Sequence, residues 1–212
     1  MTSSQPAGYL ATPASGSGAP VLVLHAWWGL NQTIKDLCQR LAAEGYLAFA
    51  PDLYHGQVAD TIEGAEKLSG GLDGEQAQAD IAESIQFLRE HAQNSGHGLA
   101  LIGFSLGAYF AWGFSNSHPD DVDKVVVFYG AGEIDFGASQ ASYLGHFAEN
   151  DPFEDADYIA EMEKALQAAG RPVTFHTYPG TGHWFFEPDR ADAYNAAAAQ
   201  LAWDRTLEFL GS

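Results

Sequence analysis

The sequence predicts an α/β fold built on a mostly parallel sheet, and three observations support this prediction. Short apolar runs of strand length alternate along the chain with longer segments whose apolar residues recur at helical spacing. Glycines and prolines separate these segments. The length of 212 residues and the hydrophobic fraction of 46% suit one globular domain. We therefore expect a single domain over residues 1–212, with a twisted sheet covered by helices on both faces, because each crossover helix must bury its apolar stripe against the sheet.

In the first half of the chain, a Gly/Ser-rich turn precedes the first clear strand. The helical spacing of Ile34, Leu37 and Leu41 predicts the first helix, and Gly45 suits its C-terminal cap. In chain order, the expected elements are strand Val21–Leu24, helix Thr33–Glu44, strand Leu47–Ala50, helix Gln76–His91 and strand Gly98–Ile102.

The second half of the chain repeats this alternation. In chain order, the expected elements are helix Leu106–Ser115, strand Val125–Tyr129, strand Tyr143–Ala148, helix Ala156–Ala169, strand Val173–Tyr178 and helix Arg190–Leu210. Gly170 is expected to end the second of these helices. Active sites in sheets of this kind lie at the carboxyl ends of the strands, so the loops after these strands are where we expect functional residues.

The charge balance excludes several kinds of partner. Twenty-eight acidic residues face nine basic ones, and the formal net charge is -19. Such a surface repels phosphates and anionic lipids, so we expect neither a nucleic acid nor a membrane as a partner. No apolar run approaches the ~20 residues that a membrane-spanning helix needs. The acidity is typical either of adaptation to high salt or of an acidic protein from an ordinary cytoplasm, and it does not indicate the reaction.

Cysteine and histidine usage bears on the compartment and on metals. Cys38 is the only cysteine, which excludes an intramolecular disulfide and fits a reducing compartment. The first residues lack the basic start and apolar stretch of a secretion signal, so we expect a cytoplasmic location. The eight histidines show no metal-binding spacing, and no phosphate-binding glycine loop is present. We therefore expect neither a metal nor a nucleotide cofactor.

The segment Gly103-Phe104-Ser105-Leu106-Gly107 carries the strongest functional signal. It follows an expected strand and opens an expected helix, which is the context of a nucleophile elbow. A strand-to-helix turn this tight leaves no room for side chains beside the nucleophile, and glycines meet that demand. The helix N-terminus also supplies amide donors and the positive end of a dipole. Ser105 is therefore the expected nucleophile of an α/β-hydrolase.

A serine hydroxyl needs a base, and hydrolases of this fold order the triad as Ser, then Asp or Glu, then His. The downstream histidines are His118, His146, His176 and His183. His183 is the expected base, because it follows the last expected strand and precedes the last expected helix. His146 and His176 lie inside expected strands and His118 lies at a helix end, where structural roles are common.

The third member of a triad orients the imidazole and stabilises its charged form. Asp151 comes after the Tyr143–Ala148 strand at its carboxyl end and is the expected acid. Asp135, after the Val125–Tyr129 strand, is the alternative.

A tetrahedral intermediate also needs oxyanion donors. The amide of Leu106 directly follows the nucleophile, and the amide of Trp27 lies in a loop after an early strand, where the second donor usually comes from. We expect the substrate pocket to be lined by His25, Trp28, Tyr54 and Trp184. The alternative for the two early tryptophans is that both are ordinary core residues.

These residues resemble the dienelactone hydrolase family over nearly the whole chain. The matching motifs are Gly8-Tyr9-Leu10-Ala11-x-Pro13, Val23-Leu24-His25-Ala26-Trp27-Trp28-Gly29-Leu30, Ala50-Pro51-Asp52-Leu53-Tyr54, the Ser105 elbow, Asn150-Asp151-Pro152, Gly180-Thr181-Gly182-His183 and Ala202-Trp203-Asp204-Arg205-Thr206-Leu207-Glu208-Phe209. The resemblance implies a lidless, monomeric hydrolase that opens lactones or small esters without a cofactor. It favours Asp151 over Asp135 and the Leu106 and Trp27 amides as donors.

The chain departs from the family pattern at functionally important positions. The family's nucleophile is typically cysteine, activated by a glutamate that follows the residue matching His25, whereas this chain has Ser105 and Ala26. The two changes agree, because a hydroxyl has a far higher pKa than a thiol and depends on His183 throughout. We interpret the chain as a serine version of the family; an engineered replacement of cysteine is the alternative. Family members that act on dienelactone hold its carboxylate with arginines, but Glu187 lies near one such position.

The sequence therefore predicts a hydrolase that cleaves a small ester or lactone through Ser105, His183 and Asp151 and an acyl-enzyme. A neutral ester or lactone is as well supported as dienelactone. Two other functions are compatible with the sequence. A thioesterase or short-peptide hydrolase would use the same triad, and a non-catalytic protein could retain the scaffold to bind a small ligand.

Overall fold

The computed structural model describes residues 4–92, 98–132 and 135–212. These residues form an α/β fold with a seven-stranded, mostly parallel sheet in the strand order β1-β3-β2-β4-β5-β6-β7, which confirms the predicted fold class. The chain divides into two compact units, residues 1–101 and residues 102–212. The strand β4, Leu99–Phe104, spans the boundary between them. That the whole chain is one domain stays a prediction.

The first unit combines a small sheet with flanking helices. Its elements are β1 Gly8–Ala11, β2 Pro20–Leu24, α1 Gln32–Ala43, β3 Leu47–Pro51, α2 Ile62–Gly70 and α3 Gly74–His91. The strands β2 and β3 pair in parallel, whereas β1 pairs with β3 in antiparallel register. The helix α1 packs on β1 and β3, and α3 packs on β2 and β3. The apolar pattern did not predict β1, which has four residues, or α2, in which only Ala65 is buried.

The ends of α1 show how local sequence sets helix boundaries. The Asn31 side chain accepts a hydrogen bond from the amide of Ile34, satisfying a donor of the first turn. Gly45 has a φ of +96° directly after the cap residue Glu44, and the Gly45 and Tyr46 amides donate to carbonyls of the last turn. A side chain is strained at such a φ, so glycine ends the helix there, as predicted.

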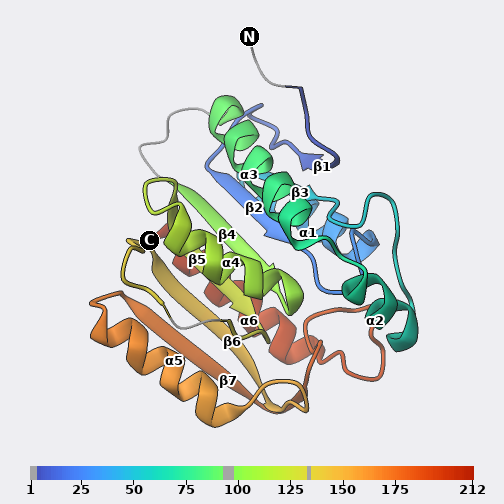
Figure 1. Cartoon of the computed structure of the whole chain (residues 1–212), viewed down its shortest axis with the longest axis vertical. Helices are drawn as coiled ribbons and strands as arrows, with labels where there is room; N and C mark the ends of the chain where they lie inside the picture. The colour runs from blue at the N-terminus through green and yellow to red at the C-terminus, as the bar shows by residue number, and fades with distance from the viewer. Residues whose placement is uncertain (1–3, 93–97, 133–134) are drawn as a thin grey trace. The chain divides into compact units, whose positions relative to one another are not determined.

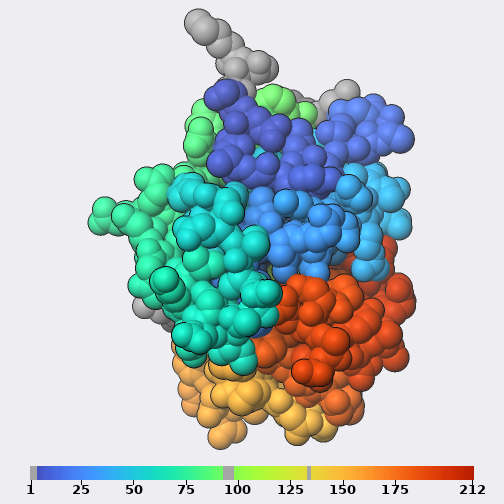
Figure 2. Space-filling model, turned by 90° about the vertical axis from the view of Figure 1, so that its right-hand side faces the viewer, coloured from blue at the N-terminus to red at the C-terminus, as the bar shows by residue number. Residues whose placement is uncertain are grey.

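The surface of the first unit carries the α2 segment, the teal region of Figure 2. Ile62 at the start of this helix is half exposed, as is Val58 before it. Thr61 caps the N-terminus of this helix, because its hydroxyl accepts a hydrogen bond from the Gly64 amide at 3.2 Å.

The second unit continues the chain with three parallel strands and three helices among the described residues. Its elements after β4 are α4 Leu106–Ser117, β5 Val122–Phe128, β6 Ser142–Asn150, α5 Ala156–Ala168, β7 Val173–Gly182 and α6 Ala196–Gly211. Figure 1 shows α4 and α5 in front of these strands and α6 behind them. The helix α4 packs on β5, α5 on β7 and α6 on β6.

The prediction of a last helix over Arg190–Leu210 is wrong at its start. The helix begins at Ala196, and residues 190–195 form turns in which the Asn195 amide donates to the Phe185 carbonyl at 2.9 Å. The Asn195 side chain accepts from the Ala198 amide at 3.1 Å and caps the helix. Asparagine stabilises a helix N-terminus better than a helix interior, so the helix starts after it.

The core of the second unit combines aliphatic strands with aromatic side chains. Val125, Val126 and Val127 of β5 are fully buried. The Trp112 ring stacks on Tyr143 at 5.4 Å, and the Tyr143 hydroxyl is hydrogen-bonded to Ser115 Oγ at 2.8 Å. A buried hydroxyl needs such a partner, because an unpaired one costs ~1–3 kcal/mol. None of the described helices is both long and apolar enough to cross a membrane.

Candidate active site

The predicted nucleophile Ser105 lies in a sharp turn between β4 and α4. Its φ of 49° and ψ of -109° place it outside the regions that side chains favour. Its amide donates to the Phe128 carbonyl at 3.0 Å, which ties the turn to the end of β5. A Cβ added to Gly103 would lie 2.5 Å from the Gly107 carbonyl oxygen. Glycine is therefore required at this close approach of strand and helix, as the sequence predicts.

His183 contacts both other candidate triad residues. Its Nε2 lies 3.0 Å from the Ser105 hydroxyl oxygen, close enough to accept the hydroxyl proton. Its Nδ1 donates to Asp151, at 2.7 Å from Oδ2 and 2.9 Å from Oδ1. Asp151 directly follows β6 and His183 directly follows β7, so two adjacent parallel strands bring the acid and the base to one edge of the sheet. The arrangement can transfer a proton from Ser105 while Asp151 orients the imidazole.

The Asp151–His183 pair is shielded from solvent by aromatic rings. The exposed fractions of the two side chains are 4% and 3%. Trp184, a predicted pocket residue, makes an edge contact with the His183 ring at 5.0 Å. Phe153 packs on His183 at 4.9 Å and on Trp184 at 5.2 Å, yet 51% of its surface is exposed. Phe153 was not predicted as a site residue, and the only signal for it in the sequence is its place two residues after Asp151.

Strained backbone marks the same edge of the second unit. Among its described residues, Ser105, Tyr129 and Trp184 are the non-glycine residues with positive φ, at 49°, 36° and 67°. They follow β4 and β5 directly and β7 at the second residue. Strained conformations of this kind cluster at functional sites, where packing around them outweighs their cost of ~1–3 kcal/mol each.

The other candidate histidines lie elsewhere. His118 is the C-terminal cap residue of α4 and its Nδ1 is hydrogen-bonded to Ser117. His146 is buried between the Tyr178 hydroxyl at 2.8 Å and the Thr206 hydroxyl at 3.1 Å, and burial holds its pKa well below the usual value. His176 stacks against His146 at 6.1 Å inside the sheet.

The alternative acid, Asp135, does not contact His183. Asp135 is exposed and accepts a hydrogen bond from the Gly137 amide at 3.0 Å. Its neighbours Glu133 and Ile134 lie outside the described residues. Asp151 is the acid that the structure brings to the imidazole.

Two carboxyl groups near the triad, the half-buried Glu154 and the buried Glu187, were not predicted as site residues. Glu154 Oε2 accepts from the Ala131 amide at 3.1 Å, and burial raises the pKa of Glu154 to about 7, with a further contribution from the charge of Asp151. Glu187 accepts from the Tyr129 hydroxyl at 2.7 Å, and burial raises its pKa to about 8. Glu187 follows His183 by four residues. For this reason it was predicted to lie near the position of an arginine with which the family resemblance implies binding of a substrate carboxylate.

The remaining predicted pocket residues, His25, Trp28 and Tyr54, belong to the first unit, as does Trp27. His25 is fully buried; its Nδ1 donates to the Ala26 carbonyl at 2.7 Å and its Nε2 accepts from the Leu53 amide at 3.3 Å, so it is neutral and holds two loops together. Burial lowers its pKa. Trp28 is also buried, and its ring makes an edge contact with Trp27 at 5.5 Å.

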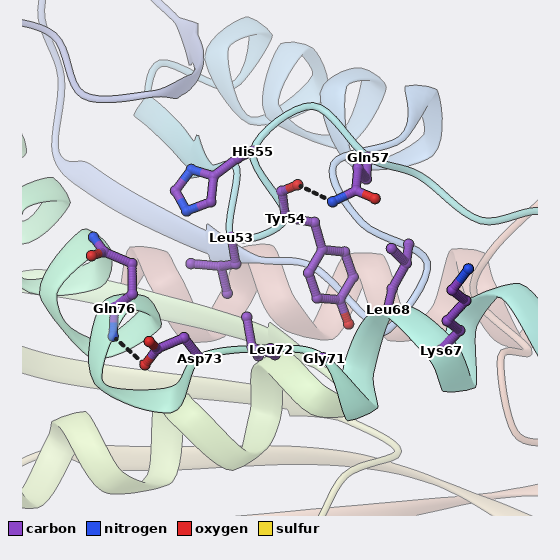
Figure 3. A pocket seen from close by; sticks show the side chains of 10 residues that line it. All are labelled: Leu53, Tyr54, His55, Gln57, Lys67, Leu68, Gly71, Leu72, Asp73 and Gln76. Atoms are coloured by element: carbon purple, nitrogen blue, oxygen red, sulfur yellow. Dashed lines mark hydrogen bonds between the residues drawn. The ribbon is translucent and has the colours of Figure 1, made fainter.

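Tyr54 lines a pocket of about 350 Å³ within the first unit. Figure 3 shows its ring at the centre of the pocket side chains, with the hydroxyl pointing toward the Gly71–Leu72 turn. Leu68 and Lys67 of α2 lie on one side of it. The hydroxyl is buried without a hydrogen-bond partner among the described residues, and burial raises its pKa to about 12.

No group of three or more His, Cys, Asp or Glu side chains is placed to hold a metal ion in the part of the chain that the structure describes. The chemistry that the described side chains offer at the candidate site is acid–base and nucleophilic.

Comparison with known proteins assigns the chain to a family. Residues 7–212 match the model of the "Dienelactone hydrolase family". "Protein usf" of Aquifex pyrophilus is 35% identical, over 95% of this chain and 91% of that protein. A protein of Aquifex aeolicus named "Putative carboxymethylenebutenolidase" is 33% identical over the same shares. The crystal structure of a "Putative Dienelactone Hydrolase" from Klebsiella pneumoniae subsp. pneumoniae superposes with a TM-score of 0.84 at 28% identity, covering 97% of this chain and 92% of that one. The chain therefore belongs to the dienelactone hydrolase family, a family of α/β-hydrolases.

Proposed function

We propose that this protein hydrolyses small carboxylic esters or lactones, with Ser105 as nucleophile, His183 as general base and acid, and Asp151 as the residue that orients His183. One observation carries the proposal: His183 lies within hydrogen-bond distance of Ser105 through one ring nitrogen and of Asp151 through the other. The three side chains follow three different strands and come together at one edge.

In the proposed mechanism, His183 Nε2 takes the Ser105 proton as the hydroxyl oxygen attacks the substrate carbonyl. The buried Asp151 carboxylate stabilises the imidazolium that forms. His183 then gives this proton to the leaving alkoxide, and an acyl-enzyme remains on Ser105. Water, deprotonated by His183, attacks the acyl-enzyme and releases the acid and free Ser105. For a lactone, both products remain one hydroxy acid.

The tetrahedral intermediate requires donors for its oxyanion. We propose the Leu106 amide as one donor, because Leu106 begins α4 directly after Ser105 and the Ser105 side chain does not cap that helix. The Trp27 amide is the proposed second donor, and this assignment depends on the family resemblance. Loss of one oxyanion donor costs ~3–4 kcal/mol in transition-state stabilisation.

The substrate class that we propose is neutral or weakly charged. Phe153 and Trp184 present aromatic surface beside His183, which favours an apolar group next to the reacting carbonyl. The net charge of -19 disfavours capture of a polyanion. Glu187 is buried near the position where the family resemblance implies an arginine, and it does not supply a cation for a substrate carboxylate.

The test compares wild type with Ser105→Ala and with Ser117→Ala, an exposed serine of the same helix. The substrates are p-nitrophenyl acetate and butyrate, γ-butyrolactone, the thioester S-phenyl thioacetate and dienelactone. We expect turnover of the oxygen esters by wild type and Ser117→Ala, and a loss of at least ~10³-fold in Ser105→Ala.

A second readout follows covalent labelling by a fluorophosphonate with intact-protein mass spectrometry. Wild type should gain one phosphonyl group and Ser105→Ala none. Hydrolysis of all oxygen esters by Ser105→Ala at the wild-type rate would remove Ser105 from the mechanism. Absence of both turnover and labelling in wild type would favour the binding protein, and preference for the thioester would favour a thioesterase.

A further inference from the structure

Glu187 is a buried carboxyl group that the proposed mechanism does not use. Its exposed fraction is 1%. Oε1 accepts a hydrogen bond from the Tyr129 hydroxyl at 2.7 Å, whereas Oε2 is buried without a hydrogen-bond partner among the described residues. A buried carboxylate oxygen with no donor is costly, whereas the neutral acid carries no charge there. The surroundings of Glu187 therefore favour the protonated form, in agreement with its pKa of about 8.

Tyr129 connects Glu187 to the candidate triad. The tyrosine is fully buried, follows β5 with a strained φ of 36°, and donates its backbone amide to the His146 carbonyl at 2.8 Å. Its ring packs on the His183 ring at 4.9 Å and on Phe104, the residue before Ser105, at 6.2 Å. The Tyr129 ring contacts the imidazole and its hydroxyl is held by Glu187, so this side chain is placed to control where the imidazole lies.

The charged groups around this pair favour a neutral Glu187. Asp189 raises the pKa of Glu187, and Arg190 lowers it by a smaller amount than burial raises it. Arg190 forms an ion pair with Asp189 at 2.7 Å, so part of its charge is already compensated. Burial raises the pKa of Tyr129 well above its usual value, with further contributions from Glu187, Asp189 and Asp151, so the tyrosine remains a hydrogen-bond donor. The half-buried Glu154 also lies in this region, where the charge of Asp151 contributes to raising its pKa after burial.

We propose that Glu187 is a positioning residue that holds Tyr129 against His183 in its neutral form, and that its ionisation limits catalysis at alkaline pH. Ionisation would place an uncompensated charge on Oε2 beside the Tyr129–His183 contact. That charge destabilises the packing of residues 184–187 and, with it, the contact of Tyr129 with His183. This inference rests on the proposed function of His183.

The first experiment uses substitutions at Glu187 and the pH profile of kcat on p-nitrophenyl butyrate. Glu187→Leu removes the acceptor for the Tyr129 hydroxyl, and we expect kcat to fall ~10-fold with KM changed less than ~2-fold, because positioning acts on the chemical step. Glu187→Gln keeps an acceptor and is never charged. It should restore kcat to within ~3-fold of wild type at pH 6.5 and abolish the fall in activity centred near pH 8.

Control variants separate Glu187 from neighbouring carboxyl groups. Glu154→Gln removes the group whose pKa is about 7, and Glu161→Gln removes an exposed carboxylate of α5. Both variants should keep the fall in kcat near pH 8. Tyr129→Phe removes a hydrogen bond that lowers the pKa of Glu187, so the fall should move to higher pH. If circular dichroism shows that Glu187→Gln does not fold, the shift of the alkaline fall in Tyr129→Phe tests whether Glu187 causes that fall.

A readout that needs no turnover distinguishes this inference from the proposed function. The imidazole of His183 is followed by NMR titration in Ser105→Ala, with and without Glu187→Gln. We expect the His183 signals to show a chemical-shift step near pH 8, caused by ionisation of Glu187, that disappears with Glu187→Gln. Persistence of this step, or of the alkaline fall in kcat, in Glu187→Gln would overturn the inference, even if every ester proved a poor substrate. If the Glu187 variants are less stable but keep the wild-type pH profiles of kcat and of the His183 chemical shift, Glu187 acts in packing only. That result would also overturn the inference.

Discussion

Adding one methyl group at Gly103 should disrupt the elbow that presents Ser105. A Cβ built on Gly103 lies 2.5 Å from the Gly107 carbonyl oxygen and 2.7 Å from both the amide nitrogen and Cα of Ala108. All three atoms belong to the backbone of the first turn of α4, so no side-chain rotation relieves the contact. Gly113, an exposed residue of the same helix, is the matched control, because a Cβ there meets nothing within 4 Å.

The magnitude follows from these distances. Ordinary contact begins at 3.4 Å, so the strand and the first turn of α4 must separate by about 0.9 Å in Gly103→Ala. Overpacking of this kind costs ~1–3 kcal/mol, whereas Gly→Ala inside a helix stabilises by ~0.5–1 kcal/mol. The free energy of unfolding should therefore differ by ~1.5–4 kcal/mol between the two variants. A displacement near 1 Å of the nucleophile should also lower kcat/KM by ~100-fold in Gly103→Ala only.

Urea denaturation followed by circular dichroism measures the stability difference, and p-nitrophenyl butyrate hydrolysis measures kcat/KM. The midpoint of thermal unfolding should change by ~2–4 °C for each kcal/mol in a chain of this size. If Gly103→Ala unfolds at the same urea concentration as Gly113→Ala and keeps wild-type activity, the close approach of strand and helix does not constrain the elbow.

Three further predictions concern the triad, the buried carboxyl group and the last helix. Asp151→Asn keeps the shape but not the charge beside His183, and kcat on p-nitrophenyl butyrate should fall by ~10³–10⁴-fold; a fall below tenfold would contradict the role of Asp151. The folded-state pKa of Glu187 is raised from 4.5 to about 8, so its contribution to stability is complete below pH 4.5 and is lost as the pH rises through 8. Urea titrations from pH 5 to 9 should show that the free energy of unfolding of wild type falls by up to ~5 kcal/mol and that Glu187→Gln lacks this fall. The same pH dependence of the free energy of unfolding in both proteins would contradict the raised pKa of Glu187. Asn195→Ala removes the N-cap of α6 and should lower the free energy of unfolding by ~1 kcal/mol. An unchanged free energy of unfolding would show that the cap does not stabilise the helix.

Much of the fold could be predicted because its signals are local. Apolar periodicity indicated the buried strands and the long amphipathic helices, whose pattern reflects one face packed on the sheet. The elements that it missed have weak patterns: β1 is short and half-buried, and α2 buries one residue. The start of α6 was misplaced because Ala-rich and polar residues before Asn195 are compatible with a helix, and only their hydrogen bonds in the folded turns exclude one.

Local sequence patterns were enough to predict the class of fold, the elbow around Ser105 and the chain order of Ser105, Asp151 and His183. These features depend on glycine geometry and on the strand after which each residue stands, and both can be read along the chain. The folding of distant segments sets two contacts that the sequence left open: His183 meets Asp151 and not the alternative Asp135, and Glu187 meets Tyr129, 58 residues away in sequence. Burial and hydrogen bonding between distant segments set the protonation of such groups, and neither is encoded in the residues adjacent to them.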